Sequence, residues 1–322
     1  MPADFIGKPH ARVDGFAKVT GQACYAAEAR EPGLLHGVVV SSDIAKGKIT
    51  RIDATQALQL AGVVEVLTHE NTPKQNGVDL KRKDMDAPPG SPFRPLHDAC
   101  IHFSMQPVAL VVAESLELAR YAALLVEIEY AREPHQTRLR DHLDQSVEGK
   151  GFRAGIESPE SHGDFETAFA DSVVKLERSY YHGAEHHNPM ELHASVVLYE
   201  KNGYLTIFDK TQGVLNTQHY VAMTFGIKRK KLRVLSPFVG GAFGSALRPQ
   251  YQLYLAVLAA TRLKRSVKVE LSRPQMFSFG HRPMTEQSIC LGASRDGSLR
   301  ALRHTAFGET SRFEKYIENV VK

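Results

Sequence analysis

The chain has 322 residues, of which 43% are hydrophobic and 24% are charged, and its formal net charge is +4. This composition is typical of a globular protein that buries a large core, and the length suggests two domains. The small net charge implies no nucleic acid or other polyanion as a partner. The basic run at residues 228–233 also lacks the interleaved aromatic residues of a nucleic-acid surface.

Neither the cysteines nor the N-terminus carries a sorting or metal motif. The 3 cysteines, Cys24, Cys100 and Cys290, lie far apart, so no iron–sulfur, zinc or disulfide framework is expected. Residues 1–7 lack the basic and apolar regions of a signal peptide, and no run of about 18 apolar residues is present to span a membrane. We therefore expect a cytoplasmic location by default, with no membrane partner.

Residues 1–135 are predicted to form an α+β domain that begins with an extended arm at residues 1–34. The predicted strands are 34–42, 63–68, 107–113 and 126–130, and the predicted helices are 54–60 and 116–125, with Ser115 as the N-cap of the second. Residues 71–97 are polar and rich in proline, which indicates a long loop.

A polar linker is expected at residues 136–162, followed by a second domain at residues 163–322. Its predicted strands are 173–181, 194–200, 204–210, 232–235 and 267–271, and its predicted helices are 164–170, 214–225 and 251–263. Asn202-Gly203 joins two of these strands as a hairpin turn, because both residues accept a positive φ.

Two loops in the second domain each follow a predicted strand and precede a predicted helix. The first contains Gln212, and the second, residues 236–247, contains Gly240, Gly241 and Gly244. If the two strands are parallel, right-handed crossovers place both loops at one edge of the sheet. Ligands of α/β sheets bind at that edge, so the two loops together indicate a binding site.

Each loop also has a simpler interpretation. The glycine loop is neither a P-loop nor a GxGxxG motif, because its pattern is Gly240-Gly241-x-x-Gly244 and no Lys-Ser/Thr follows. It either brings backbone N–H groups close to a ligand or is only a tight connection. Gln212 either contacts a cofactor or hydrogen-bonds the local backbone.

A histidine-rich segment at residues 182–193 contains His182, Glu185, His186, His187, Glu191 and His193. Gly183 and Pro189 interrupt any helix there, so no pair of histidines at i and i+4 shares one helical face. A polar loop that borders a site is favoured over a metal held by protein ligands.

Five segments, in this order, carry a family resemblance. They are Gly7-Lys-Pro-His-Ala-Arg-Val-Asp-Gly15 with Lys18-Val-Thr-Gly21, Gln106-Pro-Val-Ala-Leu-Val-Val-Ala113, His187-Asn-Pro-Met-Glu-Leu-His-Ala194, Thr211-Gln-Gly213, and Ser236-Pro-Phe-Val-Gly-Gly-Ala-Phe-Gly-Ser245. Together they resemble the molybdopterin-binding large subunit of the xanthine dehydrogenase and aldehyde oxidase family, with particular likeness to three-subunit bacterial aldehyde oxidoreductases. The resemblance implies an a/b hammerhead domain followed by the start of a mixed α/β molybdopterin-binding domain.

The resemblance also implies roles for single residues. Gln212 and the loop residues Gly241, Ala242, Phe243 and Gly244 match positions that contact the molybdenum cofactor. Phe243 also matches a wall of the substrate pocket. The pterin itself holds the metal in this family, so no protein side chain is expected as a direct ligand.

Two departures from the family pattern bear on substrate and activity. Ala246 stands where a lysine is common, and Leu247 stands where purine-oxidising members have a glutamate. Leu247, a predicted substrate-pocket residue, therefore argues for aldehydes or other N-heterocycles as substrates. The chain also stops before the glutamate that acts as general base in the family, so this chain alone is expected to be inactive.

The implied reaction of the complete subunit is oxidation of an aldehyde or N-heterocycle with water as the oxygen source. The cofactor would be molybdenum-molybdopterin, in the plain or the cytosine dinucleotide form, and electrons would leave through partner subunits that carry 2Fe-2S clusters and FAD. A partner's twin-arginine signal is a route to the periplasm. Two other functions stay open: a non-catalytic scaffold that binds partner subunits, and an unrelated nucleotide-binding α/β enzyme.

Overall fold

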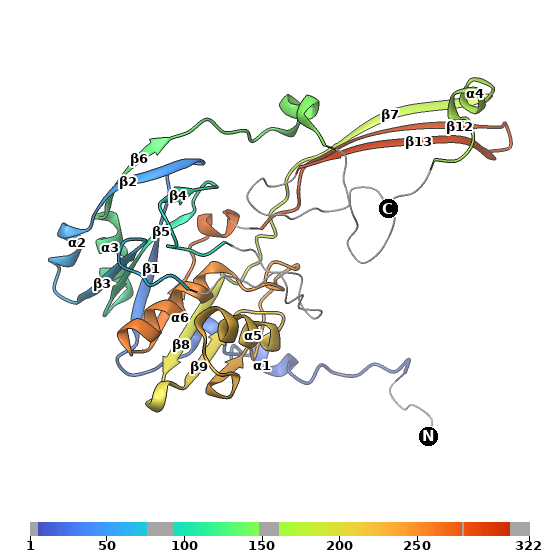
Figure 1. Ribbon diagram of the computed structural model, residues 1–322. Helices are drawn as coiled ribbons and strands as arrows, with labels where there is room; N and C mark the ends of the chain where they lie inside the picture. Colours follow the sequence, from blue (N-terminus) through green and yellow to red (C-terminus); the bar gives the residue numbers. More distant parts are fainter. Residues whose placement is uncertain (1–5, 76–92, 148–160, 279, 310–322) are drawn as a thin grey trace. The chain divides into compact units, whose positions relative to one another are not determined.

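The computed structural model describes residues 6–75, 93–147, 161–278 and 280–309 (Figure 1). The chain divides into two compact units. The first unit combines Met1–Glu133 with His187–Phe279, and the second combines Pro134–His186 with Gly280–Lys322. Parts of the predicted long loop, residues 76–92, and of the predicted linker, residues 148–160, lie outside the described residues.

A seven-stranded sheet forms the centre of the first unit, in the order β10-β9-β8-β11-β1-β5-β3. The strands are β1 (Leu35–Ser41), β3 (Val63–Thr68), β5 (Pro107–Ala113), β8 (Ala194–Tyr199), β9 (Leu205–Asp209), β10 (Leu232–Leu235) and β11 (Val267–Glu270). Strands that lie far apart in the sequence therefore contribute to one sheet.

The strand directions place several loops at one edge of this sheet. β9 and β10 are parallel, and β8 is antiparallel to both β9 and β11. β1 is parallel to β11, with Leu35 opposite Val267. β1, β9, β10 and β11 therefore end at the same edge, and β8 begins there. We call it the C-terminal edge.

Helices cover both faces of the sheet. Helix α6 (Tyr251–Leu263) is apolar along most of its length, and residues 251–260 are all buried against the sheet (Figure 1). Helix α5 (Val214–Phe225) packs beside β10. Helices α2 (Thr55–Leu58) and α3 (Leu116–Leu124) cover the opposite face near β3 and β5. β5 is buried on both faces, which explains its uninterrupted apolar sequence.

A smaller sheet, β4-β2-β6, completes the first unit. Its strands are β2 (Gly47–Asp53), β4 (Cys100–Ile101) and β6 (Glu127–Arg132). The N-terminal arm contains helix α1 (Gly15–Val19) and the 3₁₀ turn η1 (Ala26–Glu28), and η1 packs against β8 and β9. The short 3₁₀ turns η3 (Lys201–Gly203), η4 (Arg229–Lys231) and η5 (Pro274–Phe277) lie in connections.

The second unit is a three-stranded antiparallel sheet in the order β13-β12-β7. Its strands are β7 (Val174–His182), β12 (Thr285–Ala293) and β13 (Leu299–Gly308), with helix α4 (Phe165–Ala170) and the 3₁₀ segment η2 (Leu139–Gln145) beside them. The guanidinium of Arg303 lies 4.2 Å from the ring centroid of Phe165, and this cation–π contact fastens α4 to β13.

Most elements predicted from local pattern are confirmed within one or two residues. The caps are confirmed as well: the Ser115 side chain accepts from the Leu118 amide, and Gly226 ends α5 with a φ of 65°. The Asn202-Gly203 turn has the expected positive φ values of 62° and 69°. Strands β2, β12 and β13 were not predicted, because their polar and charged residues hide the alternation that marks a strand. Strand β4 was not predicted because its two residues are too few to show an alternation.

The compact units do not follow the predicted stretches 1–135 and 163–322. β1, β3 and β5 share a sheet with β8–β11, while β7 and β12–β13 form the second unit. The reason is long-range strand pairing, such as that of Leu35 with Val267, which leaves no local signal in the sequence. The boundaries at 135 and 163 remain predictions about sequence segments.

Candidate cofactor site

The two loops predicted to converge do lie together at the C-terminal edge. The backbone N–H of Gln212 donates a hydrogen bond to the Ala246 carbonyl at 2.9 Å. The Ser236 hydroxyl donates to the Thr211 carbonyl at 3.1 Å. β9 and β10 are parallel, and the chain crosses from one to the other through α5. The convergence of the loops that follow β9 and β10 is therefore confirmed.

The glycine loop has a backbone that few residues other than glycine adopt. Gly241 has a φ of 99° and Gly244 a φ of 94°. Phe243 lies between them with a φ of 54°, a left-handed conformation that is strained for an aromatic residue, and its side chain is 75% exposed. The loop thus holds an apolar ring out at the edge of the sheet at some cost in backbone strain.

The same loop presents unused hydrogen-bond donors. In the described ranges, the amide N–H groups of residues 241–244 donate to no acceptor, whereas those of Ser245 and Leu247 close turns onto Ala242 and Gly244. Consecutive free N–H groups in a tight turn form a cradle that favours anionic or electron-rich ligand atoms. Nothing lies within 4 Å of a Cβ added at Gly244, so the loop is open on that side.

The remaining predicted site residues border this cradle. The Gln212 side chain is exposed and makes no hydrogen bond to the described part of the chain, so its amide is available to a ligand. Leu247 is 44% exposed, whereas Ala242 and Ala246 are buried. Ala242 therefore has only its backbone to offer, while Gln212, Phe243 and Leu247 have exposed side chains.

A third loop, residues 187–193, supports the glycine loop, and sequence reasoning did not assign it this role. The Gly240 amide donates to Oε2 of Glu191 at 2.7 Å, and the Glu191 amide donates to the Gly240 carbonyl at 3.2 Å. A Cβ at Gly240 would lie 3.0 Å from Cβ of Glu191 and 3.3 Å from the Tyr25 ring. Gly240 is thus needed for close approach rather than for its φ.

Arg273, just beyond β11, fixes the third loop. Its guanidinium donates to Oδ1 of Asn188 at 2.9 Å, to the Met190 carbonyl at 2.7 Å and to the Pro189 carbonyl. A planar guanidinium suits such a set of fixed acceptors, because its donors form a rigid fork. No pattern in the sequence indicates this contact, because at least 83 residues separate the partners.

A group of buried ionisable side chains lies beside these loops. Nζ of Lys210 lies 3.4 Å from Nδ1 of His193, and both residues are almost fully buried. Burial lowers the pKa of Lys210 to about 8 and that of His193 to about 3. His193 is therefore neutral at physiological pH, and the Lys210 ammonium donates to its Nδ1. Burial also raises the pKa of Glu191, although the hydrogen bond from Gly240 opposes this shift.

The histidine-rich segment does not assemble into a metal centre within the described ranges, where no three His, Cys, Asp or Glu side chains come together in a suitable group. His182 and Glu185 pair at 3.2 Å, while His193 contacts Lys210. The segment therefore divides between the second unit and the loop that supports Gly240.

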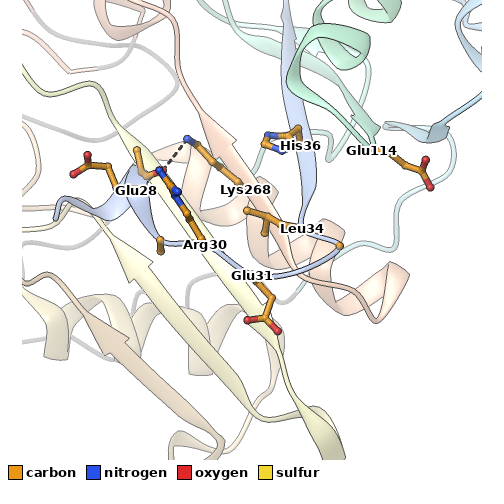
Figure 2. A pocket seen from close by; sticks show the side chains of 10 residues that line it. Glu28, Arg30, Glu31, Leu34, His36, Glu114 and Lys268 are labelled. Atoms are coloured by element: carbon orange, nitrogen blue, oxygen red, sulfur yellow. Dashed lines mark hydrogen bonds between the residues drawn. The ribbon is translucent and has the colours of Figure 1, made fainter.

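A separate pocket of about 570 Å³ lies elsewhere in the first unit (Figure 2). It is lined by residues of the arm and of β1 and β11, together with Glu114, and by none of the predicted site residues. Figure 2 shows Lys268 reaching the backbone of the arm, where its amine donates to the Ala27 carbonyl at 2.8 Å. The same amine pairs with Glu270 at 2.9 Å, so the pocket's central cation is already engaged.

Comparison with known proteins identifies the family. The model of the molybdopterin cofactor-binding domain matches residues 152–322, and that of the aldehyde oxidase and xanthine dehydrogenase a/b hammerhead domain matches residues 20–134. The chain belongs to the aldehyde oxidase and xanthine dehydrogenase family, and it contains a hammerhead domain followed by molybdopterin-binding sequence. The resemblance found in the sequence is confirmed.

Individual relatives are longer than this chain. It is 35% identical to the aldehyde oxidoreductase molybdenum-binding subunit PaoC of Escherichia coli O157:H7 over 94% of this chain and 40% of PaoC. It is 30% identical to a probable xanthine dehydrogenase subunit of Bacillus subtilis over 92% of this chain and 39% of that protein. The reconstituted CO dehydrogenase from Oligotropha carboxidovorans matches with a TM-score of 0.75 and 26% identity, covering 93% of this chain and 39% of that one.

The residues at the C-terminal edge fit a molybdopterin cofactor. The cradle at residues 241–244 and the unengaged side-chain amide of Gln212 offer hydrogen bonds to its electron-rich atoms. No atom lies within 4 Å of a Cβ built on Gly244, so the backbone of the cradle is open to a ligand on that side. None of the helices in the described ranges combines the length and hydrophobicity that a bilayer crossing needs.

The backbone of the cradle leads to a first prediction. Replacing Gly241 with alanine is expected to lower the free energy of unfolding by about 1–2 kcal/mol, because its φ of 99° is unfavourable for a residue with a Cβ. Thermal and denaturant unfolding of the purified chain measure this loss. Gly183→Ala is the matched control, since an added Cβ there would meet only the Tyr181 ring at 4.0 Å. Equal stability of the two variants would contradict the prediction.

Proposed function

We propose that this chain is the N-terminal portion of the molybdenum-cofactor-binding subunit of a molybdenum hydroxylase that oxidises aldehydes or N-heterocycles with water as the oxygen source. The observation that supports this most is the free N–H cradle at residues 241–244, which lies at the same edge as the Gln212 side chain. The chain spans about two fifths of the length of these curated relatives, so the complete activity involves sequence that those relatives have in addition.

Each residue at the edge has a distinct part in this proposal. The cofactor supplies the two-electron oxidation when it is bound. Gln212 binds it through the side-chain amide, and the N–H groups of Gly241, Ala242, Phe243 and Gly244 orient it. The strained Phe243 places its ring against the substrate and excludes water, and Leu247 makes the pocket apolar at a position where an acidic residue would bind a purine. Aldehydes and apolar heterocycles are therefore the favoured substrates.

The proposal extends to partners and location. The electrons would pass to 2Fe-2S clusters and FAD on partner subunits, and the cofactor would be molybdopterin in its plain or cytosine dinucleotide form. We place the assembly in the cytoplasm, with export on a partner's twin-arginine signal as the alternative. The name of the PaoC relative, a molybdenum-binding subunit, supports a division of the enzyme into subunits.

Metal and pterin analysis tests the proposal. The chain is purified after co-expression with the cofactor assembly machinery and the partner subunits, and molybdenum and oxidised pterin are measured in the same sample. We expect both in comparable amounts, and neither in a parallel preparation without the assembly machinery. If both are absent from the complete co-expression, the cofactor-binding function of this chain is wrong. Retained partner binding without metal would then favour the alternative of a non-catalytic scaffold.

A further inference from the structure

A chain of buried hydroxyl groups links β9, the first turn of α5 and the glycine loop. Oγ1 of Thr217 lies 3.0 Å from Oγ1 of Thr211, which lies 3.4 Å from the Ala246 carbonyl oxygen. Behind Thr217, Oδ2 of Asp209 lies 3.5 Å away, and Oδ1 of Asp209 accepts from the Ser195 hydroxyl at 2.6 Å. None of the four side chains that form this network is more than 4% exposed.

The direction of each hydrogen bond in this network of hydroxyl groups follows from the Ala246 carbonyl at one end. A carbonyl oxygen only accepts, so the Thr211 hydroxyl donates its proton to Ala246. Its oxygen then accepts from the Thr217 hydroxyl and from the Gly213 amide, which lies 3.1 Å away. The Thr211 hydroxyl thereby uses its one proton and both lone pairs. Because the backbone N–H of Gln212 donates to the same Ala246 oxygen, both loops meet at this carbonyl.

We propose that the Thr211 hydroxyl is a positioning group that locks the Gln212 loop to the glycine loop. We also propose that Asp209 determines whether the Thr217 hydroxyl donates its proton to Thr211. The benefit to cofactor binding rests on the proposed function, because the lock holds Gln212 and the cradle in one fixed relation. The lock itself rests only on the geometry of this chain. Thr211 acts through its neighbours and does not itself contact the cofactor.

The state of Asp209 decides whether the donor order holds. A protonated Asp209 donates to Thr217, which leaves the Thr217 proton for Thr211. An ionised Asp209 attracts the Thr217 proton and so competes with Thr211. The groups that act on Asp209 are the hydroxyls of Ser195 on β8 and Thr217 on α5, together with the charges of Lys210 and Glu191. Burial is the largest influence, and it raises the pKa of Asp209 to about 6.

Amide hydrogen exchange resolved by residue tests the lock on the intact chain. Thr211→Val keeps the branched shape and removes the hydroxyl, and we expect protection factors to fall about 5–10-fold at Gln212, Ser245 and Leu247. Thr211→Ser, which restores the hydroxyl, should return them to wild-type values. Thr206→Val, on the strand that precedes the Gln212 loop, is the matched control, because the Thr206 hydroxyl donates to Glu200 instead and the loop amides should not change.

The outcomes separate a lock from a merely local contact. If Thr211→Val alters only the Gly213 amide, whose acceptor it removes, and leaves Ser245 and Leu247 unchanged, the proposal is overturned. A second arm uses Asp209→Asn, whose amide donates to Thr217 at every pH. Wild-type protection at Gln212 should fall as the pH rises through about 6, whereas the Asn variant should show no step. Steps of equal size in both proteins would refute the role of Asp209.

These readouts are independent of the cofactor. An exchange effect in a chain that lacks molybdenum and pterin would support the lock and contradict the proposed function. Binding of molybdenum and pterin without any exchange effect would support the proposed function and contradict the lock.

Discussion

Acidification from pH 6.5 to pH 3 is expected to lower the stability of the wild-type chain by about 4 kcal/mol through His193, and replacing His193 with glutamine is expected to abolish this loss. His193 is only 3% exposed, and its pKa falls from the ordinary 6.5 to about 3 in the folded chain. Between these pH values the unfolded chain binds a proton at this residue and the folded chain does not. Falling pH therefore stabilises the unfolded state, and a residue without a titrating ring abolishes that contribution.

Denaturant unfolding at a series of pH values measures the effect as the difference between wild type and variant. The difference is needed because Asp209, whose pKa is raised, shifts stability in the opposite direction on acidification. Glutamine retains a carbonyl oxygen that accepts from Lys210, so the contact beside the loops is preserved. His281→Gln is an opposite-sign control, since Glu309 raises the pKa of His281. Identical pH slopes for wild type and His193→Gln would disprove the assignment.

Gln212→Ala should lower kcat/KM of the assembled enzyme about 100-fold, which is the usual cost of losing one preorganised donor at a reacting centre. The physical reason is that the side-chain amide of Gln212 is exposed at the C-terminal edge and is not engaged by the described residues. The measurement is aldehyde oxidation at several substrate concentrations, normalised to molybdenum content. This normalisation separates a loss of turnover from a loss of cofactor.

Gln59→Ala is the matched control for this measurement, because Gln59 is an exposed glutamine that caps α2, away from the C-terminal edge. Its activity should equal that of the wild type. If the Gln212 variant turns over at the wild-type rate with equal metal content, Gln212 has no role at the cofactor.

The sequence predicted elements with strong local patterns and missed those defined by distant partners. β5 was evident because it is buried on both faces, and α6 because its apolar pattern continues for over three turns. The pairing of Leu35 with Val267 was not predictable, because nothing near either residue specifies the other. The exposed strand β7 alternates well, but its partners β12 and β13 are too polar for their pattern to stand out.

The residues of the candidate site also divide into those that the sequence predicted and those that it missed. The convergence of the Gln212 loop and the glycine loop was predicted from element order on the condition that β9 and β10 are parallel, and the structure meets that condition. Lys210 was not recognised as part of the site, because a lysine at a strand end is expected in solvent and here it is 1% exposed. Glu191 and His193 stood out in the sequence as polar residues, yet only the folded chain connects them to Gly240 and Lys210.

The position of β11 between β1 and β8 has a consequence for how this chain is divided. The two family-matched segments, 20–134 and 152–322, are separate in sequence, but β1 belongs to one and β11 to the other. Cutting the polypeptide between them would not release two independent modules. It would yield complementary fragments, each with an unpaired strand edge that is satisfied by rejoining the other or by aggregation. The smallest autonomous piece that can hold the candidate site therefore includes the hammerhead strands as well as the glycine loop.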